Sequence, residues 1–158
     1  MIMVFVSHYL SSDNDVLVFI VSSRINSIHW IERSYMGNRV EEFQSFRKKM
    51  NDRILGIDSR AIKRFFSVDT LTYEPGTLNA KTKEMLGLAS SMVLRCDDCV
   101  AYHILQCKQE GVTDEELFEV FSVALTVGGS IVIPHLRRAV AFLDDYNEQQ
   151  QKNLTFSK

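Results

Sequence analysis

From Arg39 onward, apolar residues recur along the chain at every third or fourth position. This spacing matches the 3.6-residue period of an α-helix, in which such positions share one face. In the first stretch the charged residues fall on the opposite side, and the apolar face comprises Val40, Phe43, Phe46 and Met50. The pattern predicts an amphipathic helix that starts near Arg39, with helical structure continuing through most of the remaining chain.

Three breaks interrupt this pattern. Glu74-Pro75-Gly76 disfavours helix before the proline and frees the backbone at the glycine. Gly111 is suited to the left-handed conformation that ends many helices, and Gly128-Gly129 forms a further break. The close approach of two helices is the expected role of this glycine pair.

Capping residues mark where the next helices begin. Asp58-Ser59 and Asn79 can each cap a helix N-terminus, and Thr113 with Glu116 forms a capping box. The expected helices are a short one after Ser59 and others over about 79–94, 97–110, 113–127 and 131–147. The sequence thus predicts an all-α fold, a compact helical bundle, followed by a polar, frayed tail over 148–158.

Residues 1–35 differ in character from the rest. Met1–Leu10 and Val16–Val21 are apolar and rich in β-branched residues, and a polar turn separates them. Either they form a peripheral hairpin, or the natural start is Met36 and the upstream stretch is not native coding sequence. The expected organisation is an extension over 1–35, a helical domain over 36–147 and the polar tail.

The composition excludes several classes of protein. The 158 residues carry a formal net charge of −2, which argues against an electrostatic footprint for nucleic acid. The sequence contains no run of about 18 uninterrupted apolar residues, so no transmembrane helix is predicted. Three cysteines are too few for a disulfide framework. We expect a cytoplasmic protein that binds neither nucleic acid nor membrane.

Two of the cysteines are three residues apart, in Cys96-Asp97-Asp98-Cys99, where the third predicted helix gives way to the fourth. The free N–H groups of a helix N-terminus carry about half a positive charge, which favours a thiolate. Two cysteines at this spacing can cycle between dithiol and disulfide. Asp97 and Asp98 oppose thiolate formation by like-charge repulsion. The segment therefore predicts redox chemistry, with metal binding as the other use of such a pair.

His103 and Glu84 can complete this site. His103 follows Cys99 by four residues, so on a helix it lies about one turn below the cysteine and can exchange its proton. Glu84 is on the preceding predicted helix and can point back toward His103 if the two helices are antiparallel. A carboxylate there would orient the imidazole and stabilise its protonated form. The alternative is that His103 is an ordinary core residue and Glu84 a solvated helix charge.

Together, Glu84, Cys96, Cys99 and His103 match, spacing for spacing, the signature of alkylhydroperoxidase D-like proteins in the carboxymuconolactone decarboxylase family. The resemblance covers about residues 40–146. It implies an all-α bundle of the alkylhydroperoxidase D-like type whose subunits associate as trimers or hexamers. It also implies a peroxidase that acts on peroxide as acceptor, uses a dithiol reductant and needs no cofactor.

Carried over residue by residue, the resemblance implies that Cys99 attacks the peroxide and Cys96 closes the disulfide. His103 and Glu84 would form the proton relay. One departure is Asp98, because the better-studied peroxidase members have a histidine immediately before the second cysteine. Decarboxylating members of the family lack the paired cysteines, so the pair counts against a carboxymuconolactone-type decarboxylase, which is kept as an alternative.

Other residues leave alternatives open. Cys107 is expected to be a buried small hydrophobe. The alternative is a zinc site in which Cys96, Cys99 and His103 are joined by Glu84 or Cys107. A non-catalytic oligomer whose cysteine pair senses oxidation or binds metal is the main alternative to an enzyme.

His135 and Arg138 are three residues apart and share a helix face. An ion pair at a helix end or a subunit contact is the favoured interpretation. Holding an anionic substrate is the alternative.

Overall fold

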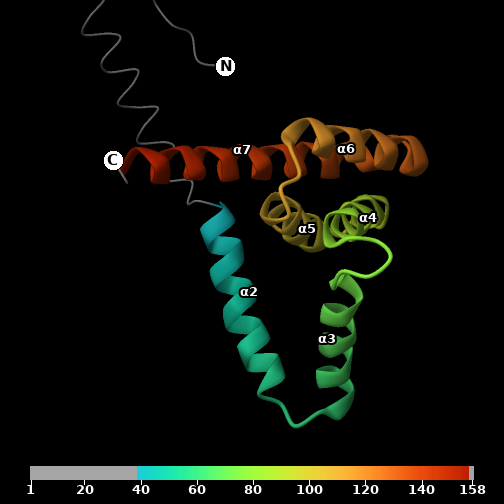
Figure 1. Cartoon of the computed structure of the whole chain (residues 1–158), viewed down its shortest axis with the longest axis vertical. Helices are drawn as coiled ribbons and strands as arrows, with labels where there is room; N and C mark the ends of the chain where they lie inside the picture. Colours follow the sequence, from blue (N-terminus) through green and yellow to red (C-terminus); the bar gives the residue numbers. More distant parts are fainter. Residues whose placement is uncertain (1–38, 157–158) are drawn as a thin grey trace, which may run out of the picture. The chain divides into compact units, whose positions relative to one another are not determined.

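The computed structural model describes residues 39–156, and every element it contains there is helical (Figure 1). The helices are α2 (Arg39–Leu55), α3 (Arg60–Tyr73), α4 (Ala80–Val93), α5 (Asp97–Gln109), α6 (Asp114–Gly128) and α7 (Ile133–Phe156), with a short 3₁₀ turn, η1 (Ser130–Val132). The predicted all-α class is confirmed. The predictions for residues 1–35 lie outside the described residues.

The predicted caps define the helix boundaries. Ser59 and Asn79 accept backbone N–H groups at the starts of α3 and α4. At α6, the Thr113 hydroxyl accepts the Glu116 N–H, while the Glu116 carboxylate accepts the Thr113 N–H at 2.8 Å. Gly111 and Gly129 both take the positive φ that favours glycine, at 74° and 73°. The capping side chains satisfy backbone groups that a helix end leaves unpaired, which is why local sequence predicts these helix boundaries well.

The core lies among α4, α5, α6 and α7. Helix α4 packs against α5 and α6, and α5 packs against α7. Gly128 allows close packing at the end of α6, because a Cβ there would collide with Val132 and also meet Val93. The largest fully buried side chains are Phe121, Leu88, Met92, Ile104, Leu117, Leu143, Val40, Val112 and Val132.

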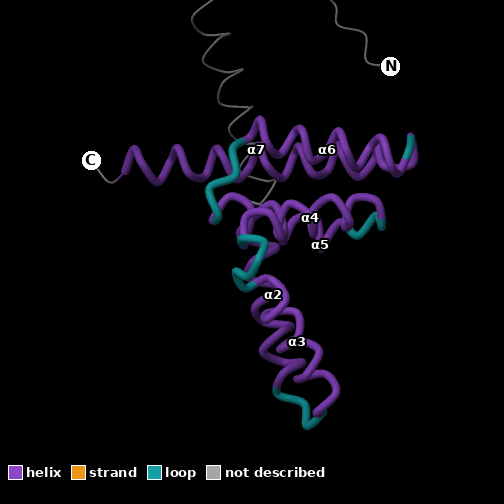
Figure 2. The backbone as a smooth tube through the Cα atoms, turned by 45° about the vertical axis from the view of Figure 1, so that its right-hand side comes forward, coloured by secondary structure: helices purple, strands orange, loops and turns teal. Residues whose placement is uncertain are grey.

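Helices α2 and α3 extend away from this group, as both Figure 1 and Figure 2 show. Helix α2 joins the core through buried Val40 and through Phe43, whose ring meets that of Phe142 edge to face at 5.7 Å. The sequence also placed Phe46 on this apolar face, but its side chain is 63% exposed. Helix α3 buries none of its residues completely.

Helix α7 is longer than predicted, because it runs to Phe156 instead of ending near Asn147. No glycine or proline interrupts residues 148–156, and Gln, Glu and Lys are good helix formers. Gln149 donates to Glu41 at 3.0 Å, and Lys152 pairs with Glu148 one turn away at 3.4 Å. These contacts extend the helix through a segment that carries no apolar pattern.

No helix within residues 39–156 combines the length and the apolar character that crossing a bilayer requires.

Candidate functional site

The turn between α4 and α5 places the first cysteine. Arg95 adopts a left-handed conformation with φ of 60°, and its N–H donates to the Met92 carbonyl at 3.1 Å. The Cys96 N–H donates to the Ser91 carbonyl at 3.0 Å, which completes a Schellman motif with an arginine in the position usually held by glycine. The reversal ends α4 and delivers Cys96 directly to the start of α5.

Cys96 is itself the N-cap of α5. Its sulfur accepts the Cys99 N–H at 3.4 Å, and the two cysteines form a disulfide with a Cα–Cα distance of 5.3 Å. Both residues are half-buried. The predicted pair is therefore present at a helix N-terminus, where the helix dipole stabilises a negatively charged sulfur once the disulfide is reduced.

His103 lies one helical turn beyond Cys99 and contacts Glu84 of α4. The distance from His103 Nδ1 to Glu84 Oε2 is 2.7 Å, and only 7% of the histidine and 4% of the glutamate are exposed. Because an ionised carboxylate only accepts hydrogen bonds, the proton is on Nδ1, and this N–H donates a hydrogen bond to Glu84. The basic nitrogen, Nε2, then faces the opposite way. The predicted contact between Glu84 and His103 is confirmed.

Tyr73, the last residue of α3, occupies the other side of the imidazole. Its hydroxyl lies 3.4 Å from His103 Nε2, and the two ring centroids are 5.2 Å apart. Burial raises the pKa of Tyr73, with further contributions from the negative charges of Glu84 and Asp69. The hydroxyl is therefore protonated at neutral pH and donates toward Nε2. The sequence does not indicate a role for Tyr73, since the contact joins positions 30 residues apart and no local pattern points to it.

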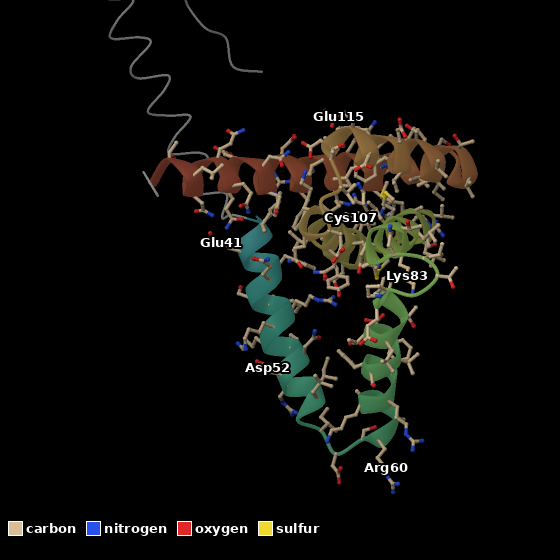
Figure 3. The ribbon with its side chains drawn as sticks, viewed as in Figure 1. Glu41, Asp52, Arg60, Lys83, Cys107 and Glu115 are labelled. Atoms are coloured by element: carbon tan, nitrogen blue, oxygen red, sulfur yellow. A yellow bond between two sulfur atoms is a disulfide. The ribbon has the colours of Figure 1, made fainter. Side chains whose placement is uncertain are left out.

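Gly87 makes room for these side chains. A Cβ at this position of α4 would lie 2.6 Å from His103 Cε1 and 2.7 Å from the Tyr73 hydroxyl oxygen. Gly87 was not among the predicted site residues, although a glycine in the middle of a predicted helix is a signal of close approach. Figure 3 labels Lys83, which lies one turn earlier on α4 and ties the helix to the end of α3 through the Thr72 and Glu74 carbonyls, at 2.8 and 2.7 Å.

Asp98, the residue before Cys99, has a cationic neighbour from α2. Arg47 lies 3.6 Å from the Asp98 carboxylate, and its guanidinium carbon is 3.9 Å from the centre of the Tyr102 ring. The Tyr102 ring in turn meets that of His103 at 5.2 Å. Helix α2 thus contributes a positive charge beside the cysteine pair.

Asp97 is held from α7. Its carboxylate receives hydrogen bonds from His135 Nδ1 at 2.7 Å and Arg138 Nε at 2.8 Å. This matches the predicted ion pair at a helix end, because Asp97 is the first residue of α5. The two basic residues bind this aspartate within the chain. Beside it is a cavity of about 200 Å³, lined by Arg39, Asp97, Val100, Ala101, Arg138, Ala139 and Phe142.

Cys107 is fully buried on α5, as predicted (labelled in Figure 3). Burial, with the charge of Glu84 and Glu116, raises its pKa to about 12. The thiol is therefore protonated at neutral pH and unreactive. The alternative zinc site does not form in this structure: Cys96 and Cys99 bond to each other, and residues 39–156 contain no group of three or more side chains placed to hold a metal.

Comparison with known protein families shows which family the chain resembles. The profile of the carboxymuconolactone decarboxylase family matches residues 60–142, from the start of α3 into α7. The chain belongs to the carboxymuconolactone decarboxylase family.

Two curated relatives are described as uncharacterized. A protein of Paracoccus denitrificans described as "Uncharacterized protein 4 in cox locus" is 27% identical over 51% of this chain and 73% of its own length. An uncharacterized protein of Cupriavidus necator is 31% identical over 55% of this chain and 77% of its own length.

Solved structures extend the comparison within the family. Two crystal structures of one Thermotoga maritima protein have 51% and 50% identity and TM-scores of 0.69 and 0.68. Each covers 71% of this chain, and 98% and 95% of the respective Thermotoga chains are matched. That protein is described as a carboxymuconolactone decarboxylase family member with a suggested involvement in the antioxidative response. A family member from Legionella pneumophila, at 24% identity, 67% and 88% coverage and a TM-score of 0.50, shares the fold.

Proposed function

We propose that the protein is a thiol-dependent peroxidase or disulfide reductase that works through Cys99 and Cys96. One observation carries this proposal: a Cys96–Cys99 disulfide at the N-terminus of α5, with a buried carboxylate–imidazole pair one helical turn further along. The similarity to the Thermotoga maritima protein with a suggested antioxidative involvement adds support.

The proposed cycle begins with reduced cysteines. The Cys99 thiolate attacks one oxygen of a peroxide, the O–O bond breaks, and the leaving oxygen takes a proton to become an alcohol or water. Cys99 is then a sulfenic acid. The Cys96 thiol attacks its sulfur, so that the disulfide forms and one water leaves. A dithiol reductant returns two electrons and two protons by thiol–disulfide exchange and restores both thiols.

The buried pair supplies proton transfer in this cycle. His103 can accept the Cys99 proton and return it to the leaving oxygen, and Glu84 stabilises the imidazolium formed between the two events. Tyr73 contacts the nitrogen that must carry this proton. The hydroxyl can therefore donate to Nε2 while the imidazole is neutral and accept from it once it is charged.

Peroxide consumption with several dithiol donors tests the proposed activity. Wild-type protein should turn over many equivalents of peroxide per chain, whereas Cys99→Ser should consume none above background. Wild-type protein that reacts only once, whatever the donor, would instead be a redox sensor. Elemental analysis that finds zinc in the reduced protein and none after oxidation would identify a metal-binding protein.

We also propose that the protein assembles with copies of itself. Helix α3 exposes 73% of Phe65, 60% of Val68 and 57% of Leu71, and Phe46 of α2 is similarly exposed. Apolar side chains gathered on a helix that buries none of its residues are typical of a subunit interface. The family resemblance favours a trimer or hexamer.

A further inference from the structure

The loop closed by the disulfide contains two adjacent carboxylates, and each has a basic partner from a different helix. Asp97 is bound by Arg138 of α7 at 2.8 Å, and Asp98 lies 3.6 Å from Arg47 of α2. Two negative charges therefore face two guanidiniums, which remain positively charged at any physiological pH. Without these partners, both carboxylates would oppose the formation of a Cys99 thiolate.

The Arg47 side chain is held in place by the ring of Tyr102. The guanidinium lies 3.9 Å from the centre of the Tyr102 ring, a geometry in which the ring face attracts a cation. The side chain is 30% exposed, whereas that of Lys48, the next residue, is 80% exposed and pairs with Asp52 on its own helix. Tyr102 therefore orients Arg47 toward the residue that precedes Cys99.

We propose that Arg47 is a positioning residue of the redox site: it offsets the charge of Asp98 and so favours the Cys99 thiolate. This inference deepens the proposed function and rests on it for its biological role. It also assigns Asp98 a role, because the aspartate and Arg47 act on the thiol as a charge pair. Removing either partner alone should change thiol reactivity, and removing both should largely restore it.

Other titratable and charged groups lie on the helices around the cysteine pair. These are Asp97 and His103 on α5, Glu84 on α4, Tyr73 on α3, and His135 and Arg138 on α7. None of these residues is changed in the variants below, and all rates are compared at one pH.

The rate of Cys99 alkylation by iodoacetamide measures the thiolate directly, because sulfur displaces iodide and no peroxide or reductant takes part. A Cys96→Ser background leaves Cys99 as the only reactive thiol, since Cys107 is buried and protonated. There, Arg47→Gln should slow alkylation by about threefold, which is typical of a partly exposed charge pair. Asp98→Asn should speed it by a similar factor, and the double variant should return close to the starting rate.

Three comparisons separate charge from packing. Lys48→Gln removes the same charge one residue along the helix and should leave the rate unchanged. At about 1 M salt, where the Debye length is about 3 Å, the effect of Arg47→Gln should shrink. Arg47→Lys keeps the charge and should retain most of the wild-type rate.

The redox equilibrium with glutathione provides a second readout in protein that retains both cysteines. Arg47→Gln should shift it toward the disulfide, because stabilising the thiolate stabilises the reduced form. If Arg47→Gln and Lys48→Gln behave alike, or if Asp98→Asn fails to compensate, the proposal is wrong. A wild-type protein without peroxide turnover would refute the proposed function, yet the alkylation series would still decide the role of Arg47.

Discussion

At the scale of single residues, the site combines a buried proton-transfer pair with a cysteine pair at a helix end. Glu84 and His103 are both buried, and their 2.7 Å hydrogen bond determines which imidazole nitrogen can act as a base. A histidine that only stabilises the core would make this hydrogen bond too. A catalytic base and a core residue differ in one result: replacing the imidazole slows the reaction with peroxide only if it is the base.

His103→Gln tests the base. Glutamine can still donate to Glu84, so the fold should persist, while the reaction of Cys99 with peroxide should slow at least about tenfold near neutral pH. Raising the pH toward about 8.5, the unperturbed thiol value, should recover part of the rate, because the thiolate then forms without help. Stopped-flow kinetics and thermal melting measure the two effects. A wild-type rate combined with a lower melting temperature would show that His103 is a core residue.

Gly87→Ala tests the packing around the imidazole. The new methyl group would lie 2.6 Å from His103 Cε1, so the imidazole and Tyr73 must move. We expect a loss of about 1–3 kcal/mol of stability, together with slower peroxide reduction. Gly76→Ala is the matched control, because its nearest neighbour is the end of Lys83 at 3.8 Å. A Gly87→Ala variant that is more stable than wild type, as expected for an ordinary helix glycine, would contradict the described contact.

Part of this site could be predicted from the sequence and part could not. Glu84 and His103 lie on consecutive helices with recognisable caps, so their meeting follows from antiparallel packing. Tyr73 and Arg47 come from α3 and α2, whose approach to α5 depends on tertiary packing that no local pattern encodes. Cys96 acts as the N-cap because the Schellman turn at Arg95 ends α4 one residue earlier.

At the scale of helices, local chemistry accounts for most boundaries. Thr113 and Glu116 satisfy each other's backbone N–H groups, and Lys81 of α4 reaches the same Glu116 carboxylate at 2.8 Å. The Lys81 hydrogen bond, followed by that of the Thr113 N–H, lowers the pKa of Glu116. The stabilisation from Glu116 is therefore present above its unfolded-state pKa and is lost as the pH falls through the lower folded-state value.

Glu116→Gln should lower the melting temperature at neutral pH, and the difference from wild type should narrow in acid, where Glu116 itself becomes protonated. Glu119→Gln, an exposed substitution on the same helix, serves as the control. Thermal denaturation across a pH series measures both. An equal difference at all pH values would mean that the charge of Glu116 is unimportant to the cap.

Helix α3 forms as predicted, whereas helix α7 runs further than predicted, and both outcomes have a physical reason. The apolar residues of α3 predict a helix correctly, but periodicity cannot say whether the apolar face meets the core of the same chain or another surface. The apolar pattern predicts an end for α7 near Asn147, but the polar segment beyond it consists of good helix formers and continues the helix to Phe156. Its contacts to Glu41 of α2, 108 residues away, are visible only in the folded chain.

At the scale of the whole molecule, the exposed face of α3 makes assembly testable. Phe65→Asp should weaken self-association without reducing helix content, because Phe65 is 73% exposed within one chain. Lys63→Asp, on the same helix, should leave assembly intact. Sedimentation at micromolar concentration with circular dichroism measures both properties. A stable, folded wild-type monomer at that concentration would contradict the proposed assembly.

The most direct test of the central claim is to locate the first oxidised sulfur. Reduced Cys96→Ser protein is treated with one equivalent of peroxide and a sulfenic-acid trap, and the adduct is mapped by mass spectrometry. We expect the adduct on Cys99, none on Cys107, and no trapping in wild-type protein, where Cys96 closes the disulfide. An adduct on neither cysteine, with the peroxide unconsumed, would contradict a redox role for the pair.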